Sequence, residues 1–348
     1  MKNPACAETR AGRTNIQANL NAGPEQPHST TVRRNKQRRP VANFLSREKQ
    51  IQVLRLLSEG NSIRSTVRLT GIHKSTVMRL VVRFGSDCRT FLDDSLANLN
   101  LRHIQCDEIW TFVGMKQGRA NKRKLDDRVI GDQYLFTALD TDTKLLVTFA
   151  VGKRSAEMTR AFIADLEKRL VRQPVMLGGD RPQISTDGWN AYVPAIRDSF
   201  RGTVKHGVLI KNYVNPEVGR YAPPQLIDVN RFNINGINDL GTICTSHVER
   251  NNLTIRTFMK RFTRLALGFS KKVENLAAAT AIHVAVYNFC RIHSTLKATP
   301  AMAAGVIDRL WSMHDLYDAV STHAAQVRAK ARRDARIQRL INRLNREE

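Results

Sequence analysis

Residues 102–114, RHIQCDEIWTFVG, form an apolar and partly β-branched run that predicts a β-strand. Asp107 interrupts this run between apolar neighbours. A carboxylate inside a strand costs desolvation free energy unless a positive charge meets it. The stretch therefore predicts the first strand of a sheet, and an acid whose burial calls for a cation such as a divalent metal ion.

The residues after this strand alternate between strand and helix patterns. Residues 133–152 predict two strands joined by a polar turn, and residues 155–171 have apolar side chains at helical spacing. Residues 182–187 predict a fourth strand, residues 188–200 a helix, and residues 202–213 a fifth strand. This order predicts an α/β domain with one mixed sheet.

A helical pattern precedes the sheet. Residues 46–60 have helical periodicity, and residues 61–85 predict two more helices separated by a turn at Gly71. The arrangement is typical of a helix-turn-helix, whose last helix enters the major groove of DNA, although other three-helix domains share the spacing. His73 stands where Ser or Thr normally caps the last helix. The residues of that helix that we expect to meet DNA are Lys74, Ser75, Thr76, Arg79 and Arg83.

The chain carries a large excess of positive charge. Its 56 Lys and Arg stand against 31 Asp and Glu, so the formal net charge is +25 and the pI is about 10.5. Such a field favours polyanions, with nucleic acid as the first candidate. A ribosomal or structural basic protein is the alternative, but such chains are usually shorter and less apolar than this one, which has 348 residues of which 42% are hydrophobic.

The cysteines and the hydropathy pattern point to an intracellular protein. Five scattered cysteines with no CxxC pair favour reduced thiols. His103 with Cys106, and Cys244 with His247, suggest zinc half-sites, but an odd separation places the first two on opposite faces of a strand, which disfavours zinc. No apolar run approaches the ~18 residues of a membrane span. We therefore expect a soluble, cytoplasmic protein without a membrane partner.

Two further acids complete a candidate site. Asp187 ends the predicted fourth strand, where ligands gather in open α/β sheets, and Glu249 lies in the predicted helix 246–256, SHVERNNLTIR. With Asp107 they could hold two Mg²⁺, or Mn²⁺, for phosphoryl transfer. Each acid also has an explanation without a metal site. Asp107 could be an exposed residue of an edge strand, Asp187 a helix N-cap, and Glu249 one partner of a helical ion pair.

Five stretches carry a family resemblance. CDEIW, STDGWNAY, HVERNNLTIR, RFTRLALGFSKKVEN and YNFCRIHSTLKATPAMAAGV resemble transposases of bacterial insertion sequences, specifically the insertion sequence 1 family, over about residues 46–306. The resemblance implies a ribonuclease H-like DDE catalytic domain, preceded by a helix-turn-helix that binds the terminal inverted repeats of the element. It implies that Asp107, Asp187 and Glu249 are the catalytic triad, and that Arg256 is the family's basic residue seven positions later.

The helix 246–256 places these side chains. Glu249 and Arg256 are seven residues apart and share one face with Leu253, so the first could reach the metal ions and the second a DNA phosphate. Arg250 is adjacent to Glu249 and does not face it, so we expect Arg250 to make a phosphate or structural contact. The basic segment 260–272 suits a DNA-facing role, with Lys260 and Arg261 as expected contacts.

Composition divides the chain into four predicted regions. Residues 1–43 are a basic arm, too poor in apolar residues to fold, which either contacts DNA or is a plain disordered leader. The helix-turn-helix domain covers 44–92, and the catalytic domain 98–306 with an irregular insertion at 214–244. Residues 307–348 are a basic helical tail that binds DNA, pairs as a coiled coil or stays solvated. Its apolar stripe consists of Val327, Ala331, Ile337, Leu340, Ile341 and Leu344.

The sequence thus predicts an insertion-sequence transposase that cleaves and joins DNA with two metal ions. Its expected partners are double-stranded DNA, as element ends and target, and further copies of itself on that DNA. Its expected place is the bacterial cytoplasm, at the nucleoid. The alternative is a non-catalytic DNA-binding protein or repressor derived from a transposase.

Overall fold

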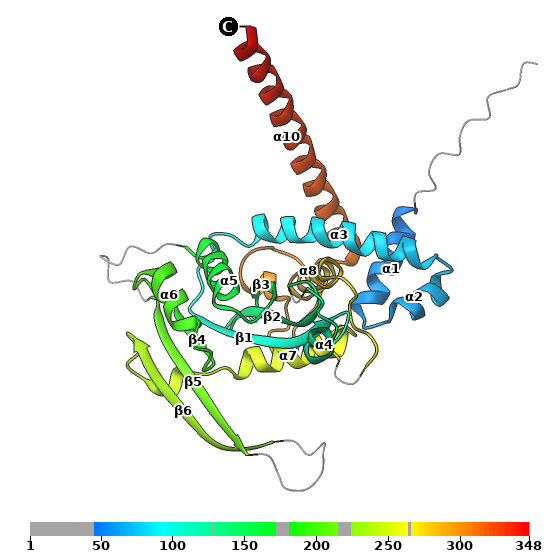
Figure 1. Cartoon of the computed structure of the whole chain (residues 1–348). Coiled ribbons are helices and arrows are strands. Elements are labelled where there is room, and N and C mark those ends of the chain that lie inside the picture. Colours follow the sequence, from blue (N-terminus) through cyan, green and yellow to red (C-terminus); the bar gives the residue numbers. More distant parts are fainter. Residues whose placement is uncertain (1–44, 127, 172–180, 215–223, 264–265, 348) are drawn as a thin grey trace, which may run out of the picture. The chain divides into compact units, whose positions relative to one another are not determined.

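A computed structural model describes residues 45–126, 128–171, 181–214, 224–263 and 266–347. The predicted arm 1–43 lies outside these residues. Leu45–Glu348 form one compact unit. Its elements (Figure 1) are α1 (Arg47–Ser58), α2 (Ile63–Thr70), α3 (Lys74–Ser95), β1 (His103–Val113), α4 (Gln117–Lys122), β2 (Gly131–Asp140), β3 (Leu146–Gly152), α5 (Ala156–Arg169), β4 (Gln183–Thr186), α6 (Tyr192–Phe200), β5 (Lys205–Val214), β6 (Gln225–Asn235), η2 (Leu240–Thr242), α7 (Ser246–Phe258), α8 (Val273–Phe289), α9 (Pro300–Ala303) and α10 (Met313–Glu347).

The described strands form one mixed sheet in the order β3-β2-β1-β4-β5-β6. β1 pairs antiparallel with β2 and parallel with β4. The β2–β3 and β5–β6 pairs are antiparallel, and the β4–β5 pair is parallel. The prediction of an α/β chain with a mixed sheet is therefore confirmed.

Helices pack against this sheet and against one another. α7 lies against β1 and β2, α5 packs against β3 and α6, and α8 lies between β3 and α3. One cluster of buried apolar side chains runs from α1 and α3 through α8 into the sheet, and includes Leu54, Phe84, Val284, Phe136 and Ile184. The N-terminal helices therefore share their core with the sheet.

The close contact between α3 and α8 depends on Gly85. A Cβ at this position would lie 2.3 Å from the backbone oxygen of Ala278. Only a residue without a side chain lets the two backbones approach so closely. The contact joins the three N-terminal helices to the rest of the unit.

The predicted turn between the second and third helices is present. Gly71 has a left-handed conformation, with φ +68°, and ends α2 by donating its N–H to the Val67 carbonyl. His73, which replaces the usual capping residue, accepts a hydrogen bond from the Ser75 N–H at 3.3 Å through Nδ1. The imidazole is therefore the N-cap acceptor at the start of α3, in place of a Ser or Thr hydroxyl.

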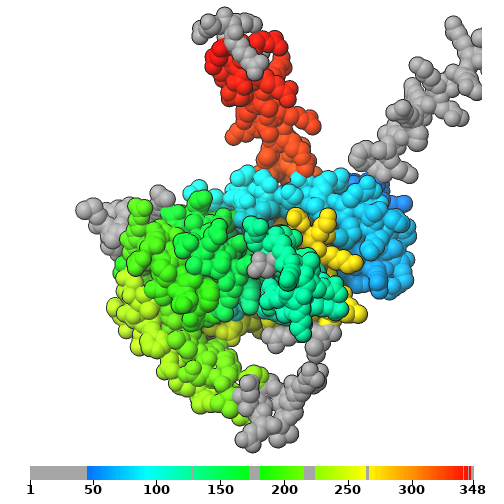
Figure 2. All heavy atoms as spheres, in the orientation of Figure 1, coloured from blue at the N-terminus to red at the C-terminus, as the bar shows by residue number. Residues whose placement is uncertain are grey.

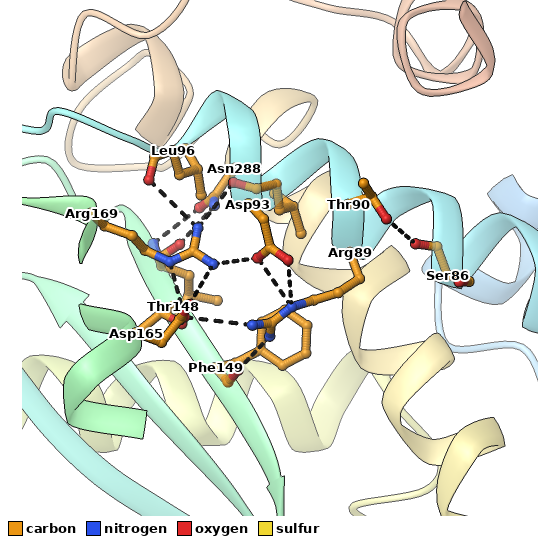
Figure 3. Close-up of polar contacts among 12 residues, drawn as sticks. Ser86, Arg89, Thr90, Asp93, Leu96, Thr148, Phe149, Asp165, Arg169 and Asn288 are labelled. Atoms are coloured by element: carbon orange, nitrogen blue, oxygen red, sulfur yellow. Dashed lines mark hydrogen bonds and ion pairs between the residues drawn. The ribbon is translucent and has the colours of Figure 1, made fainter. Parts of the chain in front are cut away.

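A buried arginine ties α3, α5 and β3 together (Figure 3). Arg169 Nε donates to Asp165 at 3.0 Å, its Nη1 donates to the Leu92 carbonyl at 3.0 Å, and its Nη2 pairs with Asp93. Asp165 also accepts the Thr148 hydroxyl. The guanidinium lowers the pKa of Asp165, whereas burial acts in the opposite direction. A charge this deeply buried is tolerated because carboxylates and carbonyls meet its donors.

Part of the predicted irregular segment 214–244 is a strand, so that prediction was wrong. β6 pairs with β5 along its whole length, and η2 follows it. All residues of β6 are exposed except Val229, which is partly buried. β6 does contain apolar residues at alternate positions, Ile227 and Val229 and then Phe232 and Ile234, but the prolines at 216, 223 and 224 favour an irregular segment and outweighed this signal. Residues 215–223 lie outside the described part.

The predicted helical tail, residues 307–348, contains the whole of α10, which begins at Met313. Leu316, Val320 and Ala324 are buried, and beyond them the helix extends away from α3 (Figures 1 and 2). Val327, Ile337 and Ile341 are exposed there. The side chains of Leu340 and Leu344 lie outside the described set. Every helix of the described residues is too short or too polar to span a membrane.

Candidate active site

The register between β1 and β4 places two aspartates side by side. Cys106 is the last residue of β1 that pairs with β4, and its partner Thr186 ends β4. The next residue in each segment is an aspartate, Asp107 on β1 and Asp187 just after β4. Parallel pairing keeps successive residues in step, so the two carboxylates meet where β4 stops and β1 continues.

A buried glutamine positions the helix that carries Glu249. Gln105, on β1, is 3% exposed, and its Oε1 accepts the N–H groups of His247 at 2.9 Å and Val248 at 3.0 Å. These are among the N–H groups that have no partner inside α7 itself. Gln105 thus caps α7 from two residues before Asp107, and this fixes Glu249 relative to the strand.

The structure brings the three predicted acids to one cavity. Asp107, Asp187 and Glu249 line a space of about 420 Å³, together with Arg154, which precedes α5, and Lys211, on β5. Trp189 and Tyr213 line it as well. The predicted acids therefore come together from β1, the end of β4 and the first turn of α7.

Glu108 is a fourth acid of this site, which the sequence reasoning missed. Carboxylate oxygens of Asp107, Glu108 and Asp187 lie within 4.8 Å of one another. Strand alternation places neighbouring residues on opposite faces, which argues against a shared site. Asp107 accepts a 2.6 Å hydrogen bond from Asn252 on α7, whereas Glu108 contacts Arg154. Beyond the end of β4, side chains from both faces can meet at the open edge of β1.

Burial and mutual repulsion disfavour the charged forms of these acids. Burial raises the pKa of Asp107 to about 7, and the charges of Asp187 and Glu249 add to the shift. Burial also raises the pKa of Glu108 to about 7, again with help from Asp187. The pKa of Asp187 is raised for the same two reasons. The site therefore holds more negative charge than its protein partners neutralise.

Arg154 and Lys211 neutralise part of this negative charge. Arg154 Nη2 lies 3.1 Å from both Glu108 Oε2 and Asp187 Oδ2. Its guanidinium carbon is 4.4 Å from the centre of the Trp189 ring. Lys211 Nζ meets Glu249 at 2.5 and 2.6 Å, one contact to each carboxylate oxygen. Neither cation was predicted, since nothing in the local sequence marks them.

The donor set suits a hard divalent ion. Mg²⁺ prefers carboxylate oxygens, and three such side chains offer oxygens within 4.8 Å. Glu108 Oε1 is buried beside the Tyr192 hydroxyl, whose hydrogen bond stabilises the carboxylate only in part, since burial still raises the pKa of Glu108. Several buried carboxyls with raised pKa at one point are the environment that a metal ion would relieve.

The other predicted site residues lie outside this cavity. Arg256 is half-buried two turns along α7 from Glu249 and is not among the described residues that line the cavity. Arg250 is exposed on α7. Lys260 and Arg261 line a separate cavity, described below. On α3, Lys74, Ser75, Arg79 and Arg83 are exposed, whereas Thr76 is half-buried.

The chain resembles the proteins of bacterial insertion elements of the insertion sequence 1 type, and the similarity is distant. The curated relative is the insertion element iso-IS1n protein InsB of Shigella dysenteriae. It is 25% identical over 170 residues, which are 49% of this chain and 84% of the relative. No protein-family model matches the chain.

A solved structure is also similar at a low level. It is the cryo-EM structure of a piggyBac transposase synaptic complex with hairpin DNA. The TM-score is 0.33 with 11% sequence identity, over 85% of this chain and 76% of that chain. At that TM-score we draw nothing from it.

Proposed function

We propose that this protein is a DDE transposase of an insertion sequence, which cleaves DNA at the ends of its element and joins them to target DNA. One observation carries the proposal: Asp107, Asp187 and Glu249 line one cavity, and this cavity holds an excess of carboxylates. The strand order and the resemblance of the five sequence motifs support a ribonuclease H-like catalytic core.

We further propose that α1–α3 are a helix-turn-helix that binds the element ends. Lys74, Arg79 and Arg83 are exposed on α3, where a major groove could receive them. The net charge of +25 supports binding to DNA phosphates. Domain boundaries at 44–92, 98–306 and 307–348, assembly of several copies on DNA, and action at the bacterial nucleoid belong to the same proposal.

In the proposed reaction, Asp107, Asp187 and Glu249 are the metal ligands, and Glu108 lies close enough to join them. Two bound Mg²⁺ or Mn²⁺ ions would activate the attacking oxygen and stabilise the leaving one. Water hydrolyses a phosphodiester at the element end, which leaves a 3′-hydroxyl on the element and a 5′-phosphate on the flanking DNA. That hydroxyl then attacks a target phosphodiester, and the new P–O bond forms as the bond to the target's 3′-oxygen breaks and that oxygen leaves as a 3′-hydroxyl. Gln105 and Asn252 hold the ligands in place through α7. When DNA binds, Arg154 and Lys211 can exchange their ion pairs with the carboxylates for contacts to DNA phosphates.

The test is a comparison of wild type with Asp187→Asn on labelled DNA that carries the element's own ends, in the presence of Mg²⁺. Asp198→Asn is the matched control, because Asp198 is exposed on α6 and does not line the cavity. Binding of the DNA is measured first for all three proteins. We expect cleavage and strand joining by wild type and by the control, and none by Asp187→Asn despite equal binding.

Binding without product from any of the three, across divalent metals and end variants, would refute the enzymatic proposal. It would favour the non-catalytic DNA-binding protein or repressor. A flat response of DNA affinity to salt would count against the helix-turn-helix part, because phosphate contacts release counterions.

A further inference from the structure

A second, larger cavity lies apart from the acids. Its volume is about 730 Å³, and it is bordered by α2, α3, α8 and the segment that follows α7. Ile63, Met78, Val81, Phe269 and Ile282 supply apolar walls. A cavity of this size accommodates a small-molecule group with a flat apolar body.

The charged residues of this cavity all have one sign. Six basic residues and no Asp or Glu occur among its described lining residues. The basic residues are Arg64, Lys74, Lys260, Arg261, Lys271 and Lys272. Lys271 and Lys272 are exposed, so they present their charge to solvent at the cavity. An occupant with an apolar body and a negative charge fits this combination.

Arg261 gives a second, independent indication of an anion. Its Nη1 donates to Ser270 Oγ at 2.9 Å, and it forms no ion pair with any described carboxylate. Arg261 is half-buried, and this burial lowers the pKa of its guanidinium, so its charge is partly removed from water. A desolvated guanidinium without a counterion is costly, and phosphate is the anion that its donors match best.

The helix α7 sets the distance between this cavity and the acids. Glu249 lines the cavity of the acids, and Phe258, nine residues later on the same helix, lines the second cavity. Nine residues of an α-helix rise about 14 Å. The two cavities therefore adjoin the same rigid helix, about two and a half turns apart along it.

We propose that the second cavity receives a single nucleotide unstacked from the DNA. Its phosphate lies at Arg261 and the lysines, and its base lies against Ile63, Met78 and Phe269. This inference rests on the proposed DNA binding, and it adds one nucleotide-binding site to the DNA interface. A phosphate backbone that merely passed over the surface would use the lysines and leave the apolar walls empty.

The experiment uses the full chain and forked DNA with an unpaired end, in which 2-aminopurine replaces one base at a time over the six positions nearest the fork. The fluorescence of this base increases when it leaves the stack. Anisotropy of a separate label measures binding. We expect wild type to raise the fluorescence at one of the six positions, while binding all six probes.

Two variants fill the cavity from different helices, Ala279→Phe on α8 and Met78→Trp on α3. Both residues are half-buried and line the cavity. Ala277→Phe is the matched control on α8, because Ala277 is also half-buried but does not line it. We expect the filled variants to lose the fluorescence change and to bind the forked DNA about tenfold more weakly, which is within the range for one stacked base. The control should behave as wild type.

Binding without a fluorescence change at any position would overturn the nucleotide site and leave the proposed DNA binding intact. The same conclusion would follow if a folded filled variant kept the change. Absence of DNA binding by wild type would instead refute the proposed function together with this site. Because two filled variants are available, misfolding of one leaves the other as the test.

Discussion

Replacement of Asp107 by Asn should stabilise the metal-free protein. Burial and neighbouring carboxylates raise the pKa of Asp107 to about 7, from an ordinary value of 3.8. The folded protein therefore holds this proton more tightly than the unfolded chain does. Ionisation of Asp107 then costs folding free energy, and this cost grows as the pH rises from about 4 to about 7. Asn cannot ionise and removes the cost.

The shift of about three pKa units corresponds to about 4 kcal/mol, because one unit is worth about 1.4 kcal/mol. The expected gain is smaller than this value, because Asn252 donates a hydrogen bond to Asp107 that stabilises its ionised form. We expect the free energy of unfolding of Asp107→Asn to exceed that of wild type by about 2–4 kcal/mol at pH 8, and to differ little from it at pH 4.

Urea unfolding without divalent metal, between pH 4 and pH 8, measures this difference. The control is Asp198→Asn, which changes an exposed aspartate and should leave the pH dependence as in wild type. An Asp107→Asn protein that is less stable than wild type at pH 8 would refute the reasoning. A difference that does not change with pH would refute it as well.

Three further predictions follow from the same contacts. Mn²⁺ affinity, measured by calorimetry, should rise between pH 6 and pH 8, because Asp107 and Glu108, with pKa values of about 7, must lose protons to bind metal. A constant affinity over this range would exclude both as ligands. Lys211→Met should bind Mn²⁺ more tightly than wild type when DNA is absent, because Lys211 competes for both oxygens of Glu249; weaker binding would contradict this competition. Arg169→Met should lower the free energy of unfolding, measured with urea, by about 1.5–3 kcal/mol, because it removes the charge-assisted hydrogen bonds of the buried guanidinium to Asp165, Asp93 and the Leu92 carbonyl. A loss below about 1 kcal/mol, typical of a surface pair, would show that the network is not essential.

The elements that bury apolar side chains were predictable from the sequence. β1–β3 and α5 have apolar side chains at strand or helix spacing, and the structure places those side chains in one core. β6 was missed although Ile227 and Val229, and then Phe232 and Ile234, alternate with polar residues, because the prolines at 216, 223 and 224 before it indicate a loop. These apolar side chains stay exposed apart from Val229, so the strand depends on its backbone pairing with β5 and not on a buried face.

The candidate site was partly predictable for a related reason. Asp107 drew attention as an acid inside an apolar strand, and Asp187 as an acid at a strand end. Glu108 did not, because alternation assigns neighbouring strand residues to opposite faces. Its approach to the other acids depends on where β4 ends beside β1, which is a property of the paired strands.

The sequence by itself determined the helices and strands with a buried face, the positive field and the acids that mark a site, because these follow from local periodicity and composition. Only the tertiary structure decided that Gln105 caps α7, that Arg154 and Lys211 meet the acids, and that Arg261 is held without a carboxylate partner among the described residues. These relations join elements distant in the chain. Strand register, helix packing and the desolvation that comes with them exist only once the chain has folded.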